Sequence, residues 1–591
     1  MIHHRETEDA EGAQSISNLR FQIPNLKFEI PILRVISASS VSLWLNSSHS
    51  TLKRMLMAAL LVLCLLCVAR AQQATYRNPV IAGDYPDPSV VRVGEEFWAA
   101  TTTGGWAPHF ALLRSRDLVN WEKVGYVFQT KPAWAKGDFW APEIVSDGGR
   151  FLVFYTARRD EGPKKRGTLC VGVADAAAPS GPYTDHGPLT CQIPERGGVG
   201  SIDAGFVRDE HGDPYLVWKA DGNDAEPDEP TSIYAQRLSD DATKLLGKRK
   251  EILRNNVSSW EGHVTEGSYI LRHGEWFYHF YSGNACCGRA CNYALGVARS
   301  RKLLGPWEKY GKNPIIAANR DWQCPGHGSI VETADGRDFL LYHSYRQRRD
   351  TFNIGREAVL DEVTWGADGW PAINGGRGPS SVAPAPLGVA GKDSSEAEFF
   401  DGFTGAKLNP EWQWPLVNQQ TASIELTGGS FLRLMPQNVA SSQNGEPVDE
   451  FAAAVVARRT TWGDYVATTL VSTRGMAATA RAGLSVYGWR GWSVGIATGG
   501  GKVSVWRREG EDMKKDLKLV AVSDAPKSDA VFLRMIAEGG ELYRFAFSTN
   551  GRDWTELGGA VDGGYIEGAR VALTAGGGVA RFDWVKVRDK K

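Results

Sequence analysis

"DPSVVRVGEEFWAATTT" (residues 87–103) shows the pattern that decides the fold of the first half of the chain. A polar residue precedes a short apolar strand, a turn rich in glycine and acidic residues follows, and a second strand completes the unit. Four later stretches repeat this order: "PEIVSDGGRFLVFYTA" (142–157), "DAGFVRDEHGDPYLVWKA" (203–220), "EGSYILRHGEWFYHFYSG" (266–283) and "HGSIVETADGRDFLLYHS" (327–344). Copies recur about every 60 residues, as expected of a repeat architecture.

Each repeat has room for four strands. Further strand-like segments lie between the copies, among them "ALLRSRDLVNWEKVG" (111–125) and "ALGVARSRKLLGPWEKYG" (294–311). Four short strands per unit and five units predict an all-β, five-bladed propeller over residues 76–379. In a propeller the innermost strand of each blade lines the central channel. We therefore expect the polar key residues of the five copies to converge there: Asp87, Glu143, Asp203, Glu266 and His327.

Four of these key residues are carboxylates, which suggests acid–base chemistry. Any one of them could be an ordinary turn residue, as Asp87 between Pro86 and Pro88 illustrates. Several like charges around one cavity are costly unless they have partners or a task. Facing carboxylates in a polar channel are typical of glycosidic bond hydrolysis, in which one acid protonates the leaving oxygen and another activates water. A third carboxylate can hold up the pKa of the acid.

Bulk composition excludes several classes of partner. The chain has 591 residues, too many for one core, and a formal net charge of −1. This balance gives no reason to expect a nucleic acid or an anionic membrane as partner. The 21 tryptophans offer flat apolar faces, which suits a neutral ligand such as a sugar. The sequence says nothing about oligomeric state.

The second half predicts another domain. Residues 380–395 belong to a stretch rich in proline, alanine, glycine and serine and are predicted to form a linker. From residue 396 to 591, alternating segments such as "DYVATTLVST" (464–473) predict an antiparallel β-sandwich.

The amino-terminal region predicts export. Two cations precede an apolar run from Met55 to Val68, and Ala69-Arg70-Ala71 follows as a cleavage site. We interpret residues 55–71 as a signal peptide and residues 1–54 as a mis-assigned upstream extension. The competing interpretation is a short membrane anchor with a cytoplasmic tail. With the signal removed, we expect a periplasmic or extracellular protein without a membrane partner.

The cysteines fit an exported protein. Removal of the signal leaves six of the eight cysteines, an even number that permits disulfides. Cys170 and Cys191 flank a strand–loop–strand segment and are the pair that we favour. "NACCGRACNY" (284–293) suggests a metal site as an alternative, but its spacing fits no standard zinc pattern. Disulfides among its three cysteines and Cys324 are the preferred interpretation, with connectivity open.

Six motifs in order resemble the family 43 glycoside hydrolases: "NPVIAGDYPDPSVV", "FWAPEI", "SIDAGFV", "TEGSYI", "GHGSIV" and "GREAVLDEVTWGADGWP". By this resemblance Asp87 is the general base, Glu266 is the general acid, and Asp203 orients the acid and tunes its pKa. The family inverts anomeric configuration and acts mostly on β-xylosides and α-L-arabinofuranosides. The second domain resembles the concanavalin-like domain of many family 43 xylosidases, with a free-standing carbohydrate-binding module as the alternative.

Further positions follow from the same resemblance. Arg356 is expected to reach a substrate hydroxyl beside the base, the alternative being a surface salt bridge. His327 matches a channel histidine that organises water around a central calcium ion in many relatives, the alternative being a core histidine. Glu143 is expected to line the pocket without chemistry, the alternative being a purely structural role. Trp106 and Trp140 are candidates for stacking on the sugar, although most tryptophans in propellers pack between blades.

We therefore expect an exported, inverting glycosidase that releases xylose or arabinofuranose from xylo- or arabino-oligosaccharides and that requires no cofactor. An endo-acting arabinanase and a non-catalytic sugar-binding propeller are the alternatives. The cysteine-rich insertion at 286–291 leaves the substrate open, because it follows the repeat that carries Glu266.

Overall fold

The computed structural model describes residues 74–159, 167–194, 197–224, 230–347, 352–391, 398–416, 422–426, 431–436, 450–488, 491–509 and 517–590. The predicted signal peptide and upstream extension lie outside the described residues, so both stay predictions. Within the described ranges, no helix has the length and apolar character needed to cross a membrane.

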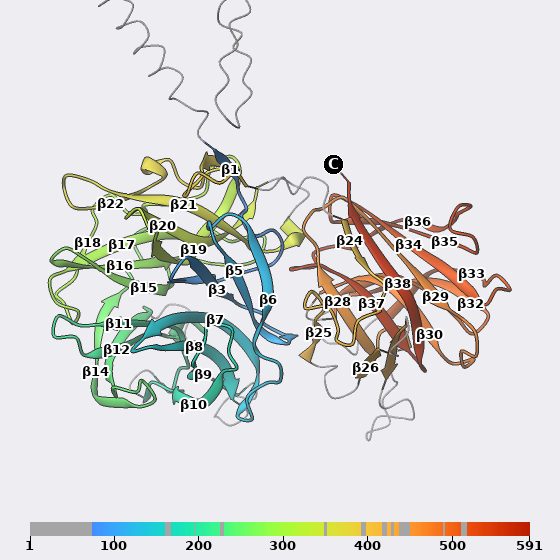
Figure 1. Cartoon of the computed structure of the whole chain (residues 1–591), viewed down its shortest axis with the longest axis horizontal. Coiled ribbons are helices and arrows are strands. Elements are labelled where there is room, and N and C mark those ends of the chain that lie inside the picture. The colour runs from blue at the N-terminus through green and yellow to red at the C-terminus, as the bar shows by residue number, and fades with distance from the viewer. Residues whose placement is uncertain are drawn as a thin grey trace, which may run out of the picture. The chain divides into compact units, whose positions relative to one another are not determined.

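Five four-stranded antiparallel sheets form the first domain (Figure 1). The first two sheets contain β2 (Ser89–Val93), β3 (Glu96–Thr101), β5 (His109–Ser115) and β6 (Trp121–Phe128), then β7 (Ala135–Asp147), β8 (Arg150–Arg159), β9 (Thr168–Ala176) and β10 (Thr184–Thr190). The third contains β11 (Ser201–Arg208), β12 (Pro214–Ala220), β13 (Ser232–Leu238) and β14 (Leu245–Arg254). The last two contain β15 (Thr265–His273), β16 (Trp276–Gly283), β17 (Ala294–Ser300) and β18 (Glu308–Lys309), then β19 (Trp322–Glu332), β20 (Asp338–Arg346), β21 (Glu357–Trp365) and β22 (Pro371–Ile373).

The first strands of the five sheets close a ring. Strand β2 contacts β7, β7 contacts β11, β11 contacts β15, β15 contacts β19, and β19 returns to β2. This is the arrangement of a five-bladed propeller, and it confirms the predicted all-β architecture. Most strands of the blades are buried along their length, as β8 and β9 illustrate, because each blade packs between two neighbours.

The two ends of the propeller are joined by hydrogen bonds. Strand β1 (Thr75–Arg77) pairs with β23 (Val382–Pro384). Beside this pair, Asn78 Nδ2 donates to the carbonyls of Leu360 (2.9 Å) and Ser380 (3.0 Å), and Asn78 Oδ1 accepts from Leu360 N (3.0 Å). The predicted linker at 380–395 therefore begins too early, since its first residues complete the propeller.

The second domain is a β-sandwich. One sheet contains β24 (Glu398–Asp401), β26 (Ala422–Leu426), β27 (Leu432–Pro436), β29 (Tyr465–Ser472), β34 (Ala530–Glu538), β35 (Leu542–Ser548), β36 (Thr555–Asp562) and β38 (Ala580–Asp589). The other contains β28 (Ala454–Arg459), β30 (Arg481–Tyr487), β31 (Ser493–Gly499), β32 (Lys502–Arg508), β33 (Leu517–Asp524) and β37 (Arg570–Gly576). Alternate residues of β29 are buried, which confirms the predicted alternation of a two-layer fold.

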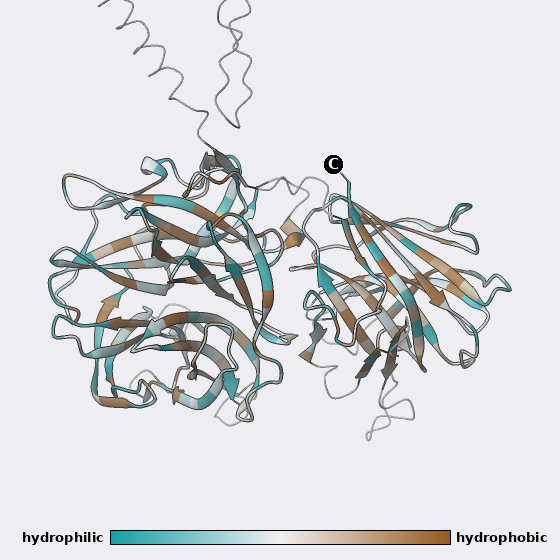
Figure 2. Ribbon diagram, viewed as in Figure 1, coloured by the Kyte–Doolittle hydropathy of each residue, from teal (hydrophilic) through white to brown (hydrophobic). Residues whose placement is uncertain are grey.

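Short elements complete the chain. They are β4 (Trp106–Ala107), which pairs with β25 (Trp414–Pro415) of the second domain, and the single-turn 3-10 helices η3 (Gly222–Asp224), η4 (Phe352–Ile354) and η5 (Asn374–Gly376). Figure 2 shows apolar segments along the strands of both domains and hydrophilic segments in many of the turns.

Three disulfides account for the six cysteines that follow residue 73. Cys170 pairs with Cys191, which confirms the prediction. Cys286 pairs with its neighbour Cys287, and Cys291 pairs with Cys324. The "NACCGRACNY" segment is therefore no zinc site, because its thiols are consumed by disulfide bonds.

Replacing Asn78 by Ala tests the closure of the propeller. The Leu360 amide would lose its partner in a partly buried place, so we expect the free energy of unfolding to fall by about 2 kcal/mol. Urea denaturation followed by tryptophan fluorescence measures the change. Asn409→Ala is the control, because the exposed Asn409 Oδ1 accepts a local bond, from Glu411 N at 2.9 Å. Equal losses for the two variants would contradict the assignment.

Candidate active site

Each inner strand of the propeller carries a kink. The backbone adopts a positive φ at Asp87 (51°), Ala141 (46°), Asp203 (55°), Gly267 (62°) and His327 (42°). The kink precedes β2 in the first blade, and in the other four it falls where the ladder register shifts. Such bulges re-aim side chains, and strained backbone of this kind concentrates at functional sites.

The kinks show that the five key residues are not fully equivalent. Asp87, Asp203 and His327 stand at the kink itself, whereas Glu266 comes one residue before Gly267. A Cβ atom on Gly267 would lie 2.9 Å from His327 Cγ, so glycine is needed there both for φ and for space. Glu143 lies two residues after its kink at Ala141. The sequence repeat thus predicts which strands supply the site, but not the position within each strand.

Asp87 is buried among hydrogen-bond donors and cations. Arg356 Nη1 donates to its Oδ1 at 3.0 Å, and Thr102 Oγ1 donates to its Oδ2 at 2.7 Å. His327 Nδ1 and His343 Nδ1 lie 3.4 and 3.1 Å from Oδ1. Burial alone would raise the pKa of Asp87, but Arg356 and the two histidines hold it far below its ordinary value. Asp87 is therefore ionised throughout the neutral and mildly acidic range, as a general base requires.

Asp203, in contrast to Asp87, has a raised pKa. Its Oδ2 accepts from the Gly267 amide at 3.1 Å and lies 3.9 Å from His327 Nδ1. Burial, aided by repulsion from Glu266 and Asp87, raises the pKa of Asp203 to about 6 despite the nearby His327.

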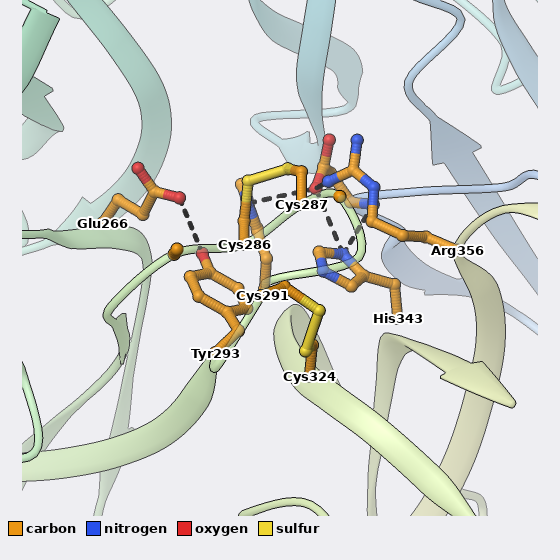
Figure 3. The surroundings of a disulfide bond; sticks show 12 residues. Glu266, Cys286, Cys287, Cys291, Tyr293, Cys324, His343 and Arg356 are labelled. Atoms are coloured by element: carbon orange, nitrogen blue, oxygen red, sulfur yellow. Dashed lines mark hydrogen bonds and ion pairs between the residues drawn. A yellow bond between two sulfur atoms is a disulfide. The ribbon is translucent and has the colours of Figure 1, made fainter. Parts of the chain in front are cut away.

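Glu266 pairs with a buried lysine. Lys219 Nζ donates to Glu266 Oε2 at 2.6 Å and also lies 3.4 Å from Asp221 Oδ1. Tyr293 donates its hydroxyl to Glu266 Oε1 at 3.0 Å (Figure 3). Burial opposes ionisation, yet Lys219 outweighs it and lowers the pKa of Glu266. The sequence analysis missed Lys219, although a lysine inside the apolar stretch "YLVWKA" needs a buried partner and so signals one.

Lys219 changes how the acid is tuned. The sequence predicted a neighbouring carboxylate that holds up the pKa of Glu266. In the structure the raised pKa belongs to Asp203, and Glu266 has the lowered one. Because the two carboxylates interact closely, they titrate as a pair.

Comparison with known proteins identifies the family to which this chain belongs. The model of the glycosyl hydrolases family 43 matches residues 76–371, and that of the beta xylosidase C-terminal concanavalin A-like domain matches residues 400–588. The chain belongs to glycosyl hydrolase family 43. It is an O-glycosidase with an accessory concanavalin-like sandwich, and it carries the predicted motifs of both domains.

The relatives of this family 43 enzyme match different fractions of its length. A xylosidase/arabinosidase 43B of Humicola insolens is 29% identical over 57% of the chain, and the match spans 62% of that relative. A xylan 1,3-beta-xylosidase of a Vibrio species is 26% identical over 83% of the chain and 91% of the relative. A solved xylan beta-1,4-xylosidase of Bacillus halodurans has a TM-score of 0.72 at 22% identity, covering 87% of this chain and all of that one, which shows the same fold.

Other residues predicted for this family 43 site lie in different surroundings. Arg356 contacts Asp87, as expected of the arginine beside the base. Trp140, in β7, is partly exposed and keeps its candidacy for sugar stacking. Glu143 lies on the same strand, and burial raises its pKa to about 8. A carboxyl that stays neutral at pH 7 fits the expected pocket-lining position without a catalytic charge.

Trp106 does not fit the expected stacking role. It is 2% exposed, Arg570 covers one face of its ring at 4.2 Å, and Tyr487 meets it edge-on. These partners come from the second domain, to which β4 is hydrogen-bonded. The structure therefore gives Trp106 a packing role in place of sugar stacking.

The expected calcium ion finds little support in the residues present. Calcium prefers oxygen ligands, and the predicted His327 turns its Nδ1 toward Asp87 and Asp203. Across the described part of the chain, no three histidine, cysteine, aspartate or glutamate side chains are grouped as metal ligands. His327 Nδ1 thus has carboxylate partners within the protein, and the calcium ion stays a prediction.

Replacing Arg356 by Met tests how Asp87 is kept ionised. Loss of the cation should raise the pKa of Asp87, and a base must be deprotonated to act. The acidic limb of kcat/KM should therefore move to higher pH, by at least about one unit. Arg356→Lys keeps the charge and should leave the limb near its wild-type position. A pH–rate profile of Arg356→Met with an unmoved acidic limb would contradict this role.

Proposed function

We propose that this family 43 enzyme is an exported, inverting glycosidase that removes terminal β-xylosyl or α-L-arabinofuranosyl units from xylo- or arabino-oligosaccharides. The proposal rests on the way charge is divided among three buried carboxylates. Asp87 is held ionised, whereas Asp203 and Glu266 form a coupled pair with one member protonated near pH 6. The names of the relatives, a xylosidase/arabinosidase and a xylan 1,3-beta-xylosidase, support the substrate class.

The chemical step follows from this division. Asp87 accepts a proton from water, and the water oxygen attacks the anomeric carbon of the terminal sugar. At the same time Glu266 gives its proton to the glycosidic oxygen, and the bond between that oxygen and the anomeric carbon breaks. Attack from the face opposite the leaving group inverts the configuration. In the reactive form the one proton of the coupled pair stands on Glu266, and Asp203, whose Oδ2 accepts from the Gly267 amide beside Glu266, is ionised.

Lys219 favours proton donation. When Glu266 gives up its proton, the resulting carboxylate is already paired with a buried ammonium at 2.6 Å. The pair strengthens Glu266 as an acid, because it stabilises the charge that develops on the residue. Lys219 itself stays cationic, since Glu266, Asp221 and Asp203 raise its pKa against the effect of burial.

Export is supported by the disulfides as well as by the predicted signal peptide. All six cysteines after residue 73 are paired. Disulfides persist in oxidising compartments and are rare in the cytosol.

Turnover of xylobiose by Glu266→Gln tests the assignment of the acid. A sugar leaving group needs protonation, so we expect kcat to fall about a thousandfold. Nitrophenolate leaves without protonation, so nitrophenyl xyloside and arabinofuranoside should lose less. The unfolding temperature is the control for the fold.

NMR of the wild-type product should show the inverted anomer first. Unchanged xylobiose turnover, or a retained anomer, would reject the mechanism, and sugar binding without any hydrolysis by the wild type would favour a binding protein.

Replacing Lys219 by Met tests the tuning of the acid. Loss of the ammonium should raise the pKa of Glu266, and the acid must be protonated to act. The alkaline limb of kcat/KM should therefore move to higher pH while kcat falls about tenfold, because the acid is weaker.

Lys309→Met is the matched control for that experiment. Lys309, on β18 of the blade that carries Glu266, pairs with the buried Glu261 at 2.7 Å outside the carboxylate cluster, so its loss should leave the pH profile in place. An alkaline limb that stays put in Lys219→Met would exclude the tuning role.

A further inference from the structure

The disulfide between neighbouring residues Cys286 and Cys287 has no part in the mechanism above. It lies in the loop that follows β16, in the same blade as Glu266. Cys286 is partly buried and Cys287 is exposed. Two sulfur atoms on a loop surface form a compact, apolar and polarisable patch.

This patch belongs to the wall of the carboxylate site. Cys286 packs against a cluster that includes Tyr293 and Tyr345. Tyr293 donates to Glu266, and the Gly288 amide of the loop lies 3.4 Å from the Tyr345 hydroxyl. In Figure 3 the disulfide is drawn with Glu266 on one side and Arg356 on the other. The disulfide therefore lies beside the side-chain cluster whose member Tyr293 is bound to Glu266.

Stability does not explain the bond. A disulfide stabilises mainly by restricting the unfolded chain, and this effect grows with the length of the closed loop. A bond between adjacent residues closes almost no loop, whereas Cys291–Cys324 spans 33 positions and already anchors the segment. The loop is also held by two bonds between Ala285 and Asn292, each 3.0 Å long.

We propose that the Cys286–Cys287 disulfide is the apolar contact surface for the sugar ring bound between Asp87 and Glu266. This inference rests on the proposed function and adds to it a residue pair that sets sugar affinity. A pentose offers hydroxyl groups at its edge and C–H bonds on its face, and the carboxylates, Arg356 and His327 can serve only the hydroxyls. An apolar face needs an apolar partner. Of the two expected partners, Trp106 is buried against the second domain, and the partly exposed Trp140 can cover only one of the two faces of the ring.

The double variant C286A/C287A tests the proposal. Loss of the apolar patch should raise KM and the Kd for free xylose or L-arabinose about fivefold and change kcat less than about twofold. C286S/C287S keeps a similar size but adds polarity, so it should show the same rise in KM and Kd. It replaces the alanine variant in the test if that variant does not fold. C170A/C191A is the control, because it removes a disulfide of the second blade and should lower the unfolding temperature without changing KM or Kd. Unchanged sugar Kd in a folded double variant overturns the proposal.

Protection in the wild-type protein gives a second test that needs no variant. Mild reduction followed by alkylation should label Cys287 first, since it is exposed. Saturating xylose or L-arabinose should slow that labelling at least about threefold and leave the labelling of the buried Cys170 unchanged. Labelling of Cys287 that is indifferent to both sugars overturns the proposal. Protection without hydrolysis of either glycoside would reject the proposed function and leave this contact standing.

Discussion

Three buried carboxylates share two buried cations, and this imbalance governs the site. Arg356 is bound to Asp87, and Lys219 is bound to Glu266. Among the described residues, neither cation is hydrogen-bonded to Asp203, and His327 Nδ1 lies 3.9 Å from Asp203 Oδ2. Burying a carboxylate without a partner is costly, so the cheapest state of the cluster retains a proton. Below about pH 6 the cluster therefore holds a protonated carboxyl beside the ionised Asp87.

The backbone kinks allow this charge arrangement to exist. An ordinary strand alternates its side chains between two faces, and here both faces pack against neighbouring blades. A left-handed residue within the inner strand, or just before it, turns one side chain off those faces. Asp87, Asp203 and His327 are turned in this way, and Gly267 provides the kink next to Glu266. Part of the strain is offset by bonds such as that from Asp203 N to Thr156 Oγ1, at 3.1 Å.

The sequence repeat made the propeller and the strands that carry the carboxylates predictable, because each blade has the same strand pattern. The residues that sequence analysis missed do not occupy the polar key position at the start of each repeat copy. Lys219 sits in a second strand, 47 positions from Glu266, and Tyr293 lies beyond the cysteine-rich loop. His343 likewise reaches Asp87 from the second strand of the fifth blade. Trp106 was misjudged because its partners belong to another domain, and periodicity within one domain carries no information about them.

The second domain is joined to the same surroundings, which argues against a free-standing binding module. Glu567 accepts from Tyr345 at 2.8 Å, and Glu541 pairs with Arg289 of the cysteine-rich loop. Arg459 Nε donates to the Asp84 carbonyl at 2.7 Å, and the Asp84 carboxylate accepts from the Arg356 amide at 3.2 Å. The sandwich therefore supports both the loop that carries the disulfide and the segment that holds the arginine of the base. The sandwich thus reaches the surroundings of the site at these two points, although neither contact involves Asp87, Asp203 or Glu266 directly.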